Sequence, residues 1–199
     1  MGLFSLLVIA DNLGEMAQHG QRLRKEKEQK LEQLVETTYS ILNHYQGQVQ
    51  AGLLSDSEAR RLAVAAIRPL RYGNGDYYWI HDLGQPVPRM VMHPTVPSLD
   101  NTVLDAPNFL RATSYRRRSQ GPYQDLNGTN LFVAMNHAVQ SAQGQGFVTY
   151  EWPKPIAGGV TPELYPKLSF VKRFEPWGWV IGSGIYMDEF EAAYWRHAQ

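Results

Sequence analysis

The sequence predicts an α+β fold in which a long helix packs on an antiparallel sheet. Apolar residues recur at three- and four-residue steps along residues 12–49, the period of a helix with one buried face. From Tyr77 onward the period changes to two, which is typical of β-strands. The later strands follow one another through short connections, and strands joined in that way pair antiparallel.

The two halves of the predicted helix at residues 12–49 differ in character. Residues 22–30 are dense in Arg, Lys, Glu and Gln, and we interpret them as a solvated charge run. This pattern is typical of a stalk that runs onto a globular body, and Gly52 is predicted to end the helix. The apolar stripe of the C-terminal half comprises Leu31, Leu34, Val35, Thr38, Ile41, Leu42, Tyr45 and Val49.

The first ten residues carry a short apolar run. It is far shorter than the roughly 20 residues needed to cross a bilayer. It also lacks the basic start and the small-residue cleavage site of a signal peptide. Two interpretations stay equally open: an ordinary helix start or appended chain end, or the outer end of a truncated membrane helix.

A second helix is predicted to begin after Ser55, because Glu58 lies three residues further on and completes a capping box. The glycines at positions 73 and 75 then break the helical period. The predicted buried face of this helix comprises Ala59, Leu62, Ala63, Ala66, Ile67 and Leu70.

Strands dominate the rest of the chain. Residues 77–82 and 89–93 are predicted to form a hairpin, and residues 94–126 are predicted to be mostly irregular. A helix starts at Thr129 or Asn130 and is stopped by glycines at 144 and 146. Three strands follow at residues 147–152, 164–174 and 179–186, and a short helix is predicted at residues 187–197.

Composition and motifs argue against several classes of function. The 19 basic and 19 acidic side chains cancel, so no overall charge favours nucleic acid. The absence of cysteine excludes disulfides, thiolate catalysis and thiolate-bound zinc. No phosphate-binding loop, zinc-protease motif or nucleophile elbow is present, and the six histidines lack metal-ligand spacing. We therefore expect no enzyme activity, no catalytic residues, no metal and no cofactor.

The strand around Lys167 carries the first indication of binding chemistry. Alternation places Lys167 and Ser169 on one face, with Leu168 and Phe170 on the other. A lysine on the inner face of a central strand is costly without a partner, and an anionic ligand would supply one. The alternative is an edge strand with Lys167 in water, and the sequence leaves the two equally open.

Aromatic residues could form the walls of such a site. Tyr150 and Trp152 share a face of their strand, whereas Tyr78 and Trp79 point to opposite faces, so only one of that pair can face a given pocket. His93 ends its strand just before Pro94. Aromatic walls with a few cationic or hydroxyl groups are typical of small-molecule sites.

An ordered set of fragments resembles the single-Cache sensor domain, which lies outside the inner membrane in bacterial chemoreceptors, histidine kinases and cyclic-dinucleotide enzymes. The resemblance covers about residues 30–190. The fragments are RYG (71–73), DYYWI (76–80), MHP (92–94), GFV (146–148), WPKP (152–155), PKLSFV (166–171) and PWGWVIGSGIY (176–186).

This resemblance implies a PAS-like antiparallel sheet of five to six strands with a long N-terminal helix packed along it. It implies a membrane-proximal stalk or appended end at residues 1–30, a ligand-binding domain at 31–190 and a C-terminal helix at 191–199 leading toward a second membrane segment. The whole protein would be anchored in the membrane with this domain in the periplasm and an output domain in the cytoplasm. A homodimer through the long helix is a further expectation.

The resemblance also implies the ligand: a short carboxylate such as acetate, propionate or pyruvate, held between the sheet and covering loops. Lys167, with His93 or a tyrosine hydroxyl, is expected to hold the carboxylate. By position, the residues that match the family's pocket are Tyr78, Trp79, His93, Tyr150, Trp152, Lys167 and Ser169.

One departure concerns the segment from 108 to 126, which is longer than in the shortest members of the family. It contains the basic run at 116–118, which we interpret as a solvated loop in preference to a ligand clamp. Two other functions stay open: a structural or dimerisation module without a small-molecule ligand, and an enzyme with an unfamiliar site.

Overall fold

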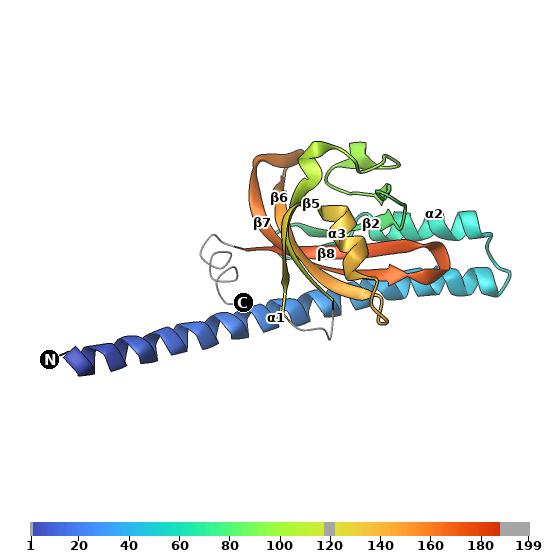
Figure 1. The fold of residues 1–199 in the computed structure, drawn as a ribbon. Helices are drawn as coiled ribbons and strands as arrows, with labels where there is room; N and C mark the ends of the chain where they lie inside the picture. The colour runs from blue at the N-terminus through green and yellow to red at the C-terminus, as the bar shows by residue number, and fades with distance from the viewer. Residues whose placement is uncertain (1, 118–121, 188–199) are drawn as a thin grey trace.

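The computed structural model describes the backbone of residues 2–117 and 122–187, with side chains from residue 14 onward within those ranges. The α+β class and the long N-terminal helix are confirmed (Figure 1). The helices are α1 (Gly2–Gln50), α2 (Asp56–Ile67) and α3 (Leu131–Ala138). The strands are β1 (Arg71–Tyr72), β2 (Asp76–Asp82), β3 (Met90–Met92), β4 (Leu110–Arg117), β5 (Gln124–Asn130), β6 (Gln145–Ile156), β7 (Gly159–Phe174) and β8 (Trp179–Tyr186).

All eight of these strands join one antiparallel sheet. Its order is β1-β2-β8-β7-β6-β4-β5. Strand β3 lies off this order and pairs with Ile80 and His81 of β2, beyond the residues that pair with β1. The expected number was five to six strands, and the difference arises largely from the segment predicted to be irregular. That segment forms β4 and the start of β5, because β4 pairs along β6 as well as with β5. Pairing with a strand distant in sequence leaves no local signal, so periodicity did not predict it.

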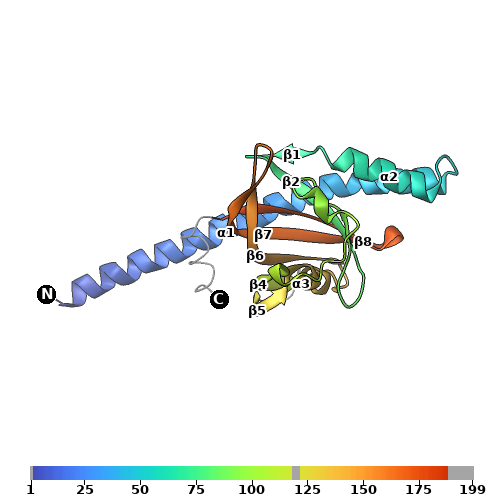
Figure 2. The ribbon, with the colours of Figure 1, turned by 90° about the horizontal axis from the view of Figure 1, so that it is seen from above.

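Helices α1 and α2 cover one face of the sheet and lie side by side (Figure 2). Ser55 caps α2 as predicted, since its hydroxyl accepts from the amide of Glu58. The predicted stripe of α1 faces the sheet, and Leu31, Val35 and Leu42 in it are fully buried. These helices therefore close the first of two hydrophobic cores.

The N-terminal part of α1 projects beyond the sheet (Figure 1). Near the projecting part, Glu28 is buried although it lies in the charged segment. The Glu28 carboxylate accepts from Arg116 Nη2 at 2.8 Å and from the Tyr123 hydroxyl at 2.7 Å. The segment is therefore solvated only in part.

Among the described residues, no helix is both long enough and apolar enough to cross a membrane.

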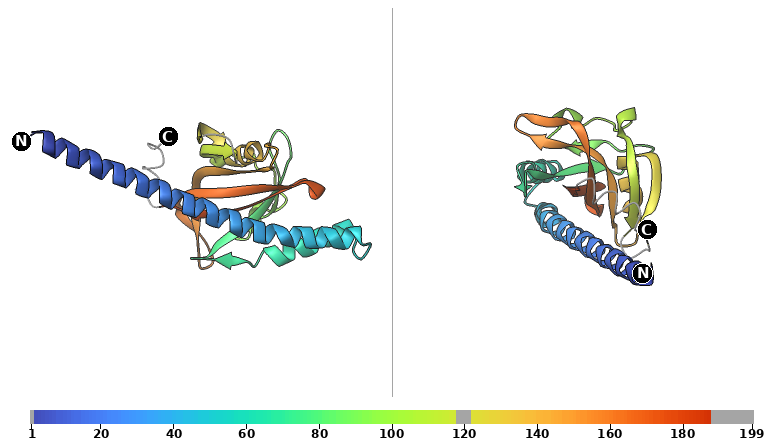
Figure 3. Two further views of the ribbon diagram at one scale, coloured as in Figure 1. Left: turned by 90° about the horizontal axis from the view of Figure 1, so that it is seen from below. Right: turned by 90° about the vertical axis from the view of Figure 1, so that its left-hand side faces the viewer.

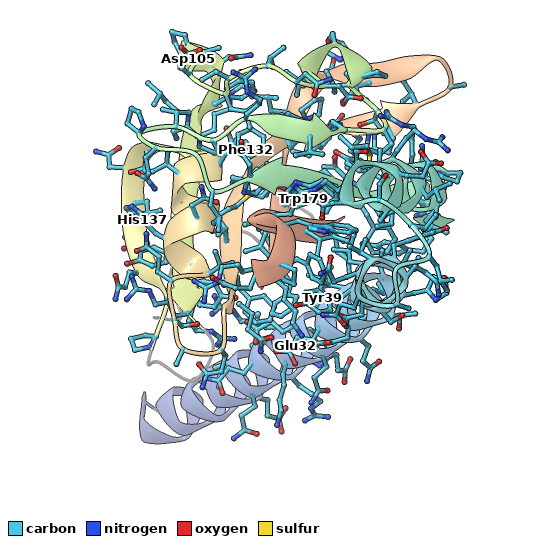
Figure 4. The ribbon with its side chains drawn as sticks, turned by 90° about the vertical axis from the view of Figure 1, so that its right-hand side faces the viewer. Glu32, Tyr39, Asp105, Phe132, His137 and Trp179 are labelled. Atoms are coloured by element: carbon cyan, nitrogen blue, oxygen red, sulfur yellow. The ribbon has the colours of Figure 1, made fainter. Side chains whose placement is uncertain are left out.

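The opposite face of the sheet is covered by α3 and by the segment that contains the short 3-10 helices η1 (Pro97–Leu99) and η2 (Pro107–Phe109). Asn130 caps α3 by accepting from the amides of Phe132 and Val133. A second core lies on this side. The sheet lies between α1 and α3 (Figure 3) and so separates the two cores. Figure 4 shows Tyr39 and Trp179 on the α1 side, with Phe132 and His137 on the α3 side.

The short helix predicted at residues 187–197 lies almost wholly outside the described residues. The three strands predicted before it are confirmed, although β6 and β7 each extend further into their shared hairpin than predicted.

Candidate ligand-binding site

Lys167 occupies a central strand and is 1% exposed. Its strand, β7, pairs with β6 on one side and β8 on the other, which places Lys167 between Tyr150 and Tyr186. The interpretation of Lys167 as a solvated edge residue is therefore wrong. A buried ammonium group must be stabilised by its surroundings or by a partner of opposite charge.

Aromatic rings surround the ammonium group. Lys167 Nζ lies 4.2 Å from the ring centroid of Tyr77, 4.8 Å from that of Tyr186 and 5.5 Å from that of Trp79. The faces of aromatic rings attract cations but do not neutralise them. Within the described ranges no carboxylate forms an ion pair with Lys167.

Ser169 lies two residues along the same face and is fully buried. Its hydroxyl is 2.9 Å from that of Tyr150, and either oxygen can donate. Burial raises the pKa of Tyr150 well above its ordinary value, so its hydroxyl stays protonated. This pair therefore holds two neutral hydroxyl groups beside the ammonium group.

His93 is buried at the end of β3, and its backbone fixes its tautomer. The Val96 amide donates to His93 Nδ1 at 3.1 Å, so a neutral ring carries its proton on Nε2. Burial lowers the pKa of His93 well below its ordinary value, and the positive charges of Lys167, Arg68 and Arg71 lower it further. His93 is thus a neutral hydrogen-bond donor and adds no positive charge.

The indole of Trp152 stands at the centre of an aromatic group. Its ring is 5.6 Å from His93, 6.0 Å from Phe132 and 6.2 Å from Phe109, the last in a stacked arrangement. Phe109 comes from η2 and Phe132 from α3, which lies above this face of the sheet in Figure 4. Part of the longer segment therefore contributes a wall to the site.

Two buried donors in this group have no acceptor among the described residues. They are the hydroxyl of Tyr77, which meets no acceptor in good hydrogen-bond geometry although the Tyr186 hydroxyl is its neighbour, and Nε1 of Trp152. His93 connects them, since its ring lies 5.1 Å from that of Tyr77 and 5.6 Å from that of Trp152. Most buried donors in folded proteins are satisfied, so two orphans beside a buried cation indicate a place for an acceptor.

Six of the seven predicted residues meet on this face of the sheet, and Tyr78 does not. Tyr78 points to the α1 side, where its ring lies 5.6 Å from that of Tyr72. Trp79 is on the site's face, but its indole N–H is already bonded to His81 Nδ1 at 3.2 Å. Trp79 can therefore offer a wall but no free donor.

The prediction omitted three residues of the cluster. Tyr77 shares a face with Trp79 by strand alternation, so the sequence could have revealed it. Tyr186 requires the register of β8 against β7, and Phe109 lies in a segment without periodicity. The basic run lies elsewhere: Arg116 binds Glu28, and Arg117 Nε donates to the carbonyl of His137. The third arginine of the run, Arg118, lies outside the described residues.

An open groove of about 550 Å³ adjoins the buried cluster. It touches the cluster at Pro94, next to His93, and at Gly75, two residues before Tyr77. The groove is lined by Arg71, Asn74, Gly75, Pro94, Thr95, Pro97 and residues 155–159. The part of the chain that the structure describes holds no group of His, Asp and Glu arranged to bind a metal ion.

Known proteins are similar to this chain in sequence and in fold. Residues 11–197 match a family described as Cache domain. The methyl-accepting chemotaxis protein McpP of Pseudomonas putida is 37% identical over 192 residues, which are 96% of this chain and 31% of that protein. The sensor histidine kinase MctS of Rhizobium johnstonii is 29% identical over 136 residues, 68% of this chain and 24% of that protein. The chain spans less than a third of either relative.

Several solved structures are also similar to this chain. One of them was reported for carboxylic acid recognition by a Cache chemosensory domain. It is 35% identical to this chain with a TM-score of 0.67, and the alignment covers 84% of this chain and 98% of that chain. A periplasmic sensor domain of a chemotaxis protein has 40% identity and a TM-score of 0.64, with 83% and 98% covered. A methyl-accepting chemotaxis protein of Vibrio parahaemolyticus, 20% identical with a TM-score of 0.63 over 88% of this chain and 98% of that one, shares the fold.

Proposed function

This chain belongs to the Cache domain family, and from that premise we propose that its buried cluster binds a small organic carboxylate. The chain is a sensor domain of the kind carried by chemoreceptors and sensor kinases. The ligand class, the residues that hold it and the response to binding are the proposal.

The observation that carries the proposal is Lys167, a buried ammonium group that forms no ion pair among the described residues, although its charge acts on the carboxylate of Asp76. The Tyr77 hydroxyl and the Trp152 indole N–H are unsatisfied donors in the same cluster. His93 Nε2–H is a third donor with no partner in the described ranges. A carboxylate carries one negative charge and accepts several hydrogen bonds, so it matches one cation and several neutral donors.

The aromatic rings around the site favour a small ligand. The rings of Tyr77, Trp152 and Phe109 enclose the donors, and all three side chains are at most 5% exposed. A ligand tail in this position must fit between rings that already contact one another. We therefore propose an acid of two to four carbons, of the acetate, propionate or pyruvate kind. The related structure reported for carboxylic acid recognition supports the same class.

The proposed place of the domain is the periplasm, as part of a protein anchored in the inner membrane. The relative described as a periplasmic sensor domain supports this location. Binding would shift β8 or α1 and so reach a cytoplasmic output domain. A ligand can shift such an equilibrium only by its differential affinity for the two states. A homodimer through α1 stays a proposal, which sedimentation of the isolated domain at several concentrations tests.

A ligand screen tests the proposed class. We expect acetate, propionate or pyruvate to raise the melting temperature, whereas sugars and cationic amines leave it unchanged. At 100 times its dissociation constant, a ligand adds about 2.7 kcal/mol to the free energy of unfolding. Stabilisation by amines, with none by any carboxylate, would refute the proposed class.

Substitution of the cation tests the site. Lys167→Met keeps the apolar stem but leaves a bound carboxylate unpaired, which commonly costs about 2–5 kcal/mol of binding free energy. We expect binding to the best acid of the screen to be lost or greatly weakened in calorimetric titration, with the unliganded fold intact.

The matched control is Lys172→Met. Lys172 lies on the same strand, but its ammonium group is paired with Glu36 of α1 on the other face. It should bind the acid as the unsubstituted chain does. Equal dissociation constants for Lys167→Met and the unsubstituted chain would remove Lys167 from the site.

A further inference from the structure

Strand β8 runs beneath the site and has glycine at two successive positions that face the site. These are Gly182 and Gly184, which lie opposite Val171 and Ser169 of β7. Neither glycine has a positive φ, so neither is required by the backbone conformation. The reason for glycine at these positions must be space.

The space above Gly184 is filled by the two polar side chains of the site, and the backbone carbonyl of Leu168 lies 2.8 Å from the place of an added Cβ. A Cβ at position 184 would lie 2.1 Å from Ser169 Oγ and 2.7 Å from Lys167 Cε. Both distances are far shorter than a van der Waals contact. The stem of Lys167 therefore occupies the room that a side chain at position 184 would need.

Lys167 uses this room to cross β8. Its own strand is β7, and the sheet order places β8 between β7 and β2 (Figure 2). Nevertheless, Lys167 Nζ lies 4.2 Å from the ring centroid of Tyr77, a residue of β2. The side chain thus passes over Gly184 and delivers its ammonium group two strands away, beside the unsatisfied Tyr77 hydroxyl.

We propose that Gly184 is a positioning residue that sets where the cation of the site lies, and through it which ligand lengths fit. The proposal rests on the proposed carboxylate function and specifies how the site is built. A methyl group at position 184 points from the sheet toward the site. It would push the Lys167 stem away from the sheet, into the space between the aromatic walls. The anion would then be held further from the floor, and less room would remain for its tail.

The placement of Lys167 can be tested without any ligand. Protons above aromatic faces resonate upfield, so the ε-methylene of Lys167 should be displaced in proton–carbon NMR spectra, as should those of Lys154 over Tyr165 and Lys172 over Tyr39. The absence of the Lys167 signal from the spectrum of Lys167→Met assigns it. In Gly184→Ala we expect this signal to move toward the position of an ordinary lysine. An unchanged signal would overturn the proposal.

Binding gives the second readout. We expect Gly184→Ala to weaken binding roughly tenfold to a hundredfold, because a displaced cation makes weaker charge-assisted bonds to the carboxylate. The loss should grow along the series acetate, propionate and butyrate, because the longer tails compete with the displaced stem. Equal losses for all three acids, or no loss, would contradict the role in ligand length.

Gly146→Ala is the matched control. It is also a strand glycine without positive φ, and its added Cβ would lie 2.6 Å from the carbonyl of Arg116 and 2.9 Å from Ala138 Cβ. It therefore carries similar crowding away from Lys167, and we expect an unchanged lysine signal and an unchanged order of acids. A change in Gly146→Ala equal to that in Gly184→Ala would overturn the specific role of position 184.

Two further variants keep the test decisive if Gly184→Ala does not fold. The double variant Ser169→Gly, Gly184→Ala removes the closest clash but keeps that with Lys167, and Ser169→Gly alone is its reference. The ε-methylene signal of Lys167 should then move in the double variant and stay in place in Ser169→Gly. If the unsubstituted chain binds no carboxylate, the proposed function fails, while the lysine signal still decides whether Gly184 places the cation.

Discussion

At the scale of single residues, the site holds polar groups that the fold itself leaves unsatisfied. The Tyr77 hydroxyl and Trp152 Nε1 are buried without acceptors among the described residues, and a buried donor without a partner costs about 1–3 kcal/mol. Such a cost is tolerated where a ligand can recover it. The isolated domain is therefore less stable than its packing would allow, and binding restores part of the difference.

Tyr77→Phe tests this interpretation. Removing an unsatisfied hydroxyl should leave the free energy of unfolding unchanged or raise it by up to about 1 kcal/mol, while carboxylate affinity falls. Chemical denaturation and calorimetric titration measure the two effects. Tyr123→Phe provides the contrast, because that hydroxyl donates to buried Glu28. It should lower stability and leave binding unchanged, and a stability loss in Tyr77→Phe would contradict the interpretation.

His81 predicts a pH dependence of stability. It is fully buried, it accepts from Trp79 Nε1 on Nδ1, and it donates from Nε2 to Asn136 at 3.1 Å. Burial lowers its pKa from 6.5 to about 4. Below pH 6.5 the unfolded chain takes up a proton on this histidine that the folded chain does not bind. The free energy of unfolding should therefore fall as the pH drops from 6.5 to 4, and the contribution of neutral His81 should be fully present above pH 6.5. The loss from His81 is at most about 3 kcal/mol.

Denaturation at several pH values measures this effect. His81→Gln should flatten the fall in stability between pH 6.5 and 4, although His93 contributes with the same sign because its pKa is also lowered. His44→Gln is the control, since His44 is exposed on α1. A stability curve with the same slope in His81→Gln and the unsubstituted chain would show that His81 does not titrate in this way.

At the scale of elements, α1 consists of a projecting part and a packed part that meet near Glu28. Arg116 of β4 and Tyr123, just before β5, bind this carboxylate, and Arg24 lies 4.0 Å from the Tyr123 ring centroid. The hairpin that the sequence did not reveal thus attaches the sheet to the start of the packed part. From Leu31 onward, apolar burial holds the helix.

Hydrogen exchange should reveal this boundary. We expect slow amide exchange at residues 31–42 and fast exchange at residues 14–22. Glu28→Ala should speed exchange at residues 24–30 and lower the free energy of unfolding by about 1–3 kcal/mol, because Tyr123 and Arg116 lose their acceptor. The control Glu36→Ala breaks a more exposed pair with Lys172 and should cost less than about 1 kcal/mol. Uniformly fast exchange at residues 31–49 would contradict a helix packed on the sheet.

At the scale of the whole molecule, one sheet serves two cores. Phe170 and Ile181 face α1 and α2, whereas Val171 and Val180, their neighbours in the chain, face α3 and the site. Neither core can lose its strands without exposing the other. The ligand site is therefore tied to the packing of the long helix, although the sheet separates them.

This arrangement predicts a single cooperative unfolding transition. Denaturation followed by tryptophan fluorescence and by far-ultraviolet circular dichroism should give coincident curves. Ile181→Ala in one core and Met135→Ala in the other should each lower the free energy of unfolding by about 2–5 kcal/mol and shift both curves together. Separate transitions by the two probes would show that the cores unfold independently.

The sequence by itself determined the features that depend on local pattern. The stripe from Leu31 to Val49, the cap at Ser55 and the strands from Phe147 onward follow from helical period, capping chemistry and alternation, which act over a few residues. Composition and alternation singled out six of the side chains that meet at the site, and the resemblance added the family and the expectation that they line one pocket. Trp152 and Lys167 could be assigned to their faces because strand alternation is strict.

Only the tertiary structure decided which strands are neighbours and what each face meets. It placed β7 in the middle of the sheet, which buried Lys167 and excluded a solvated edge residue. It paired β4 with β6, put Tyr78 on the helix side, and set Gly184 beneath the lysine stem. The physical reason is that register and pairing join residues distant in sequence, so their energies depend on partners that no local pattern records.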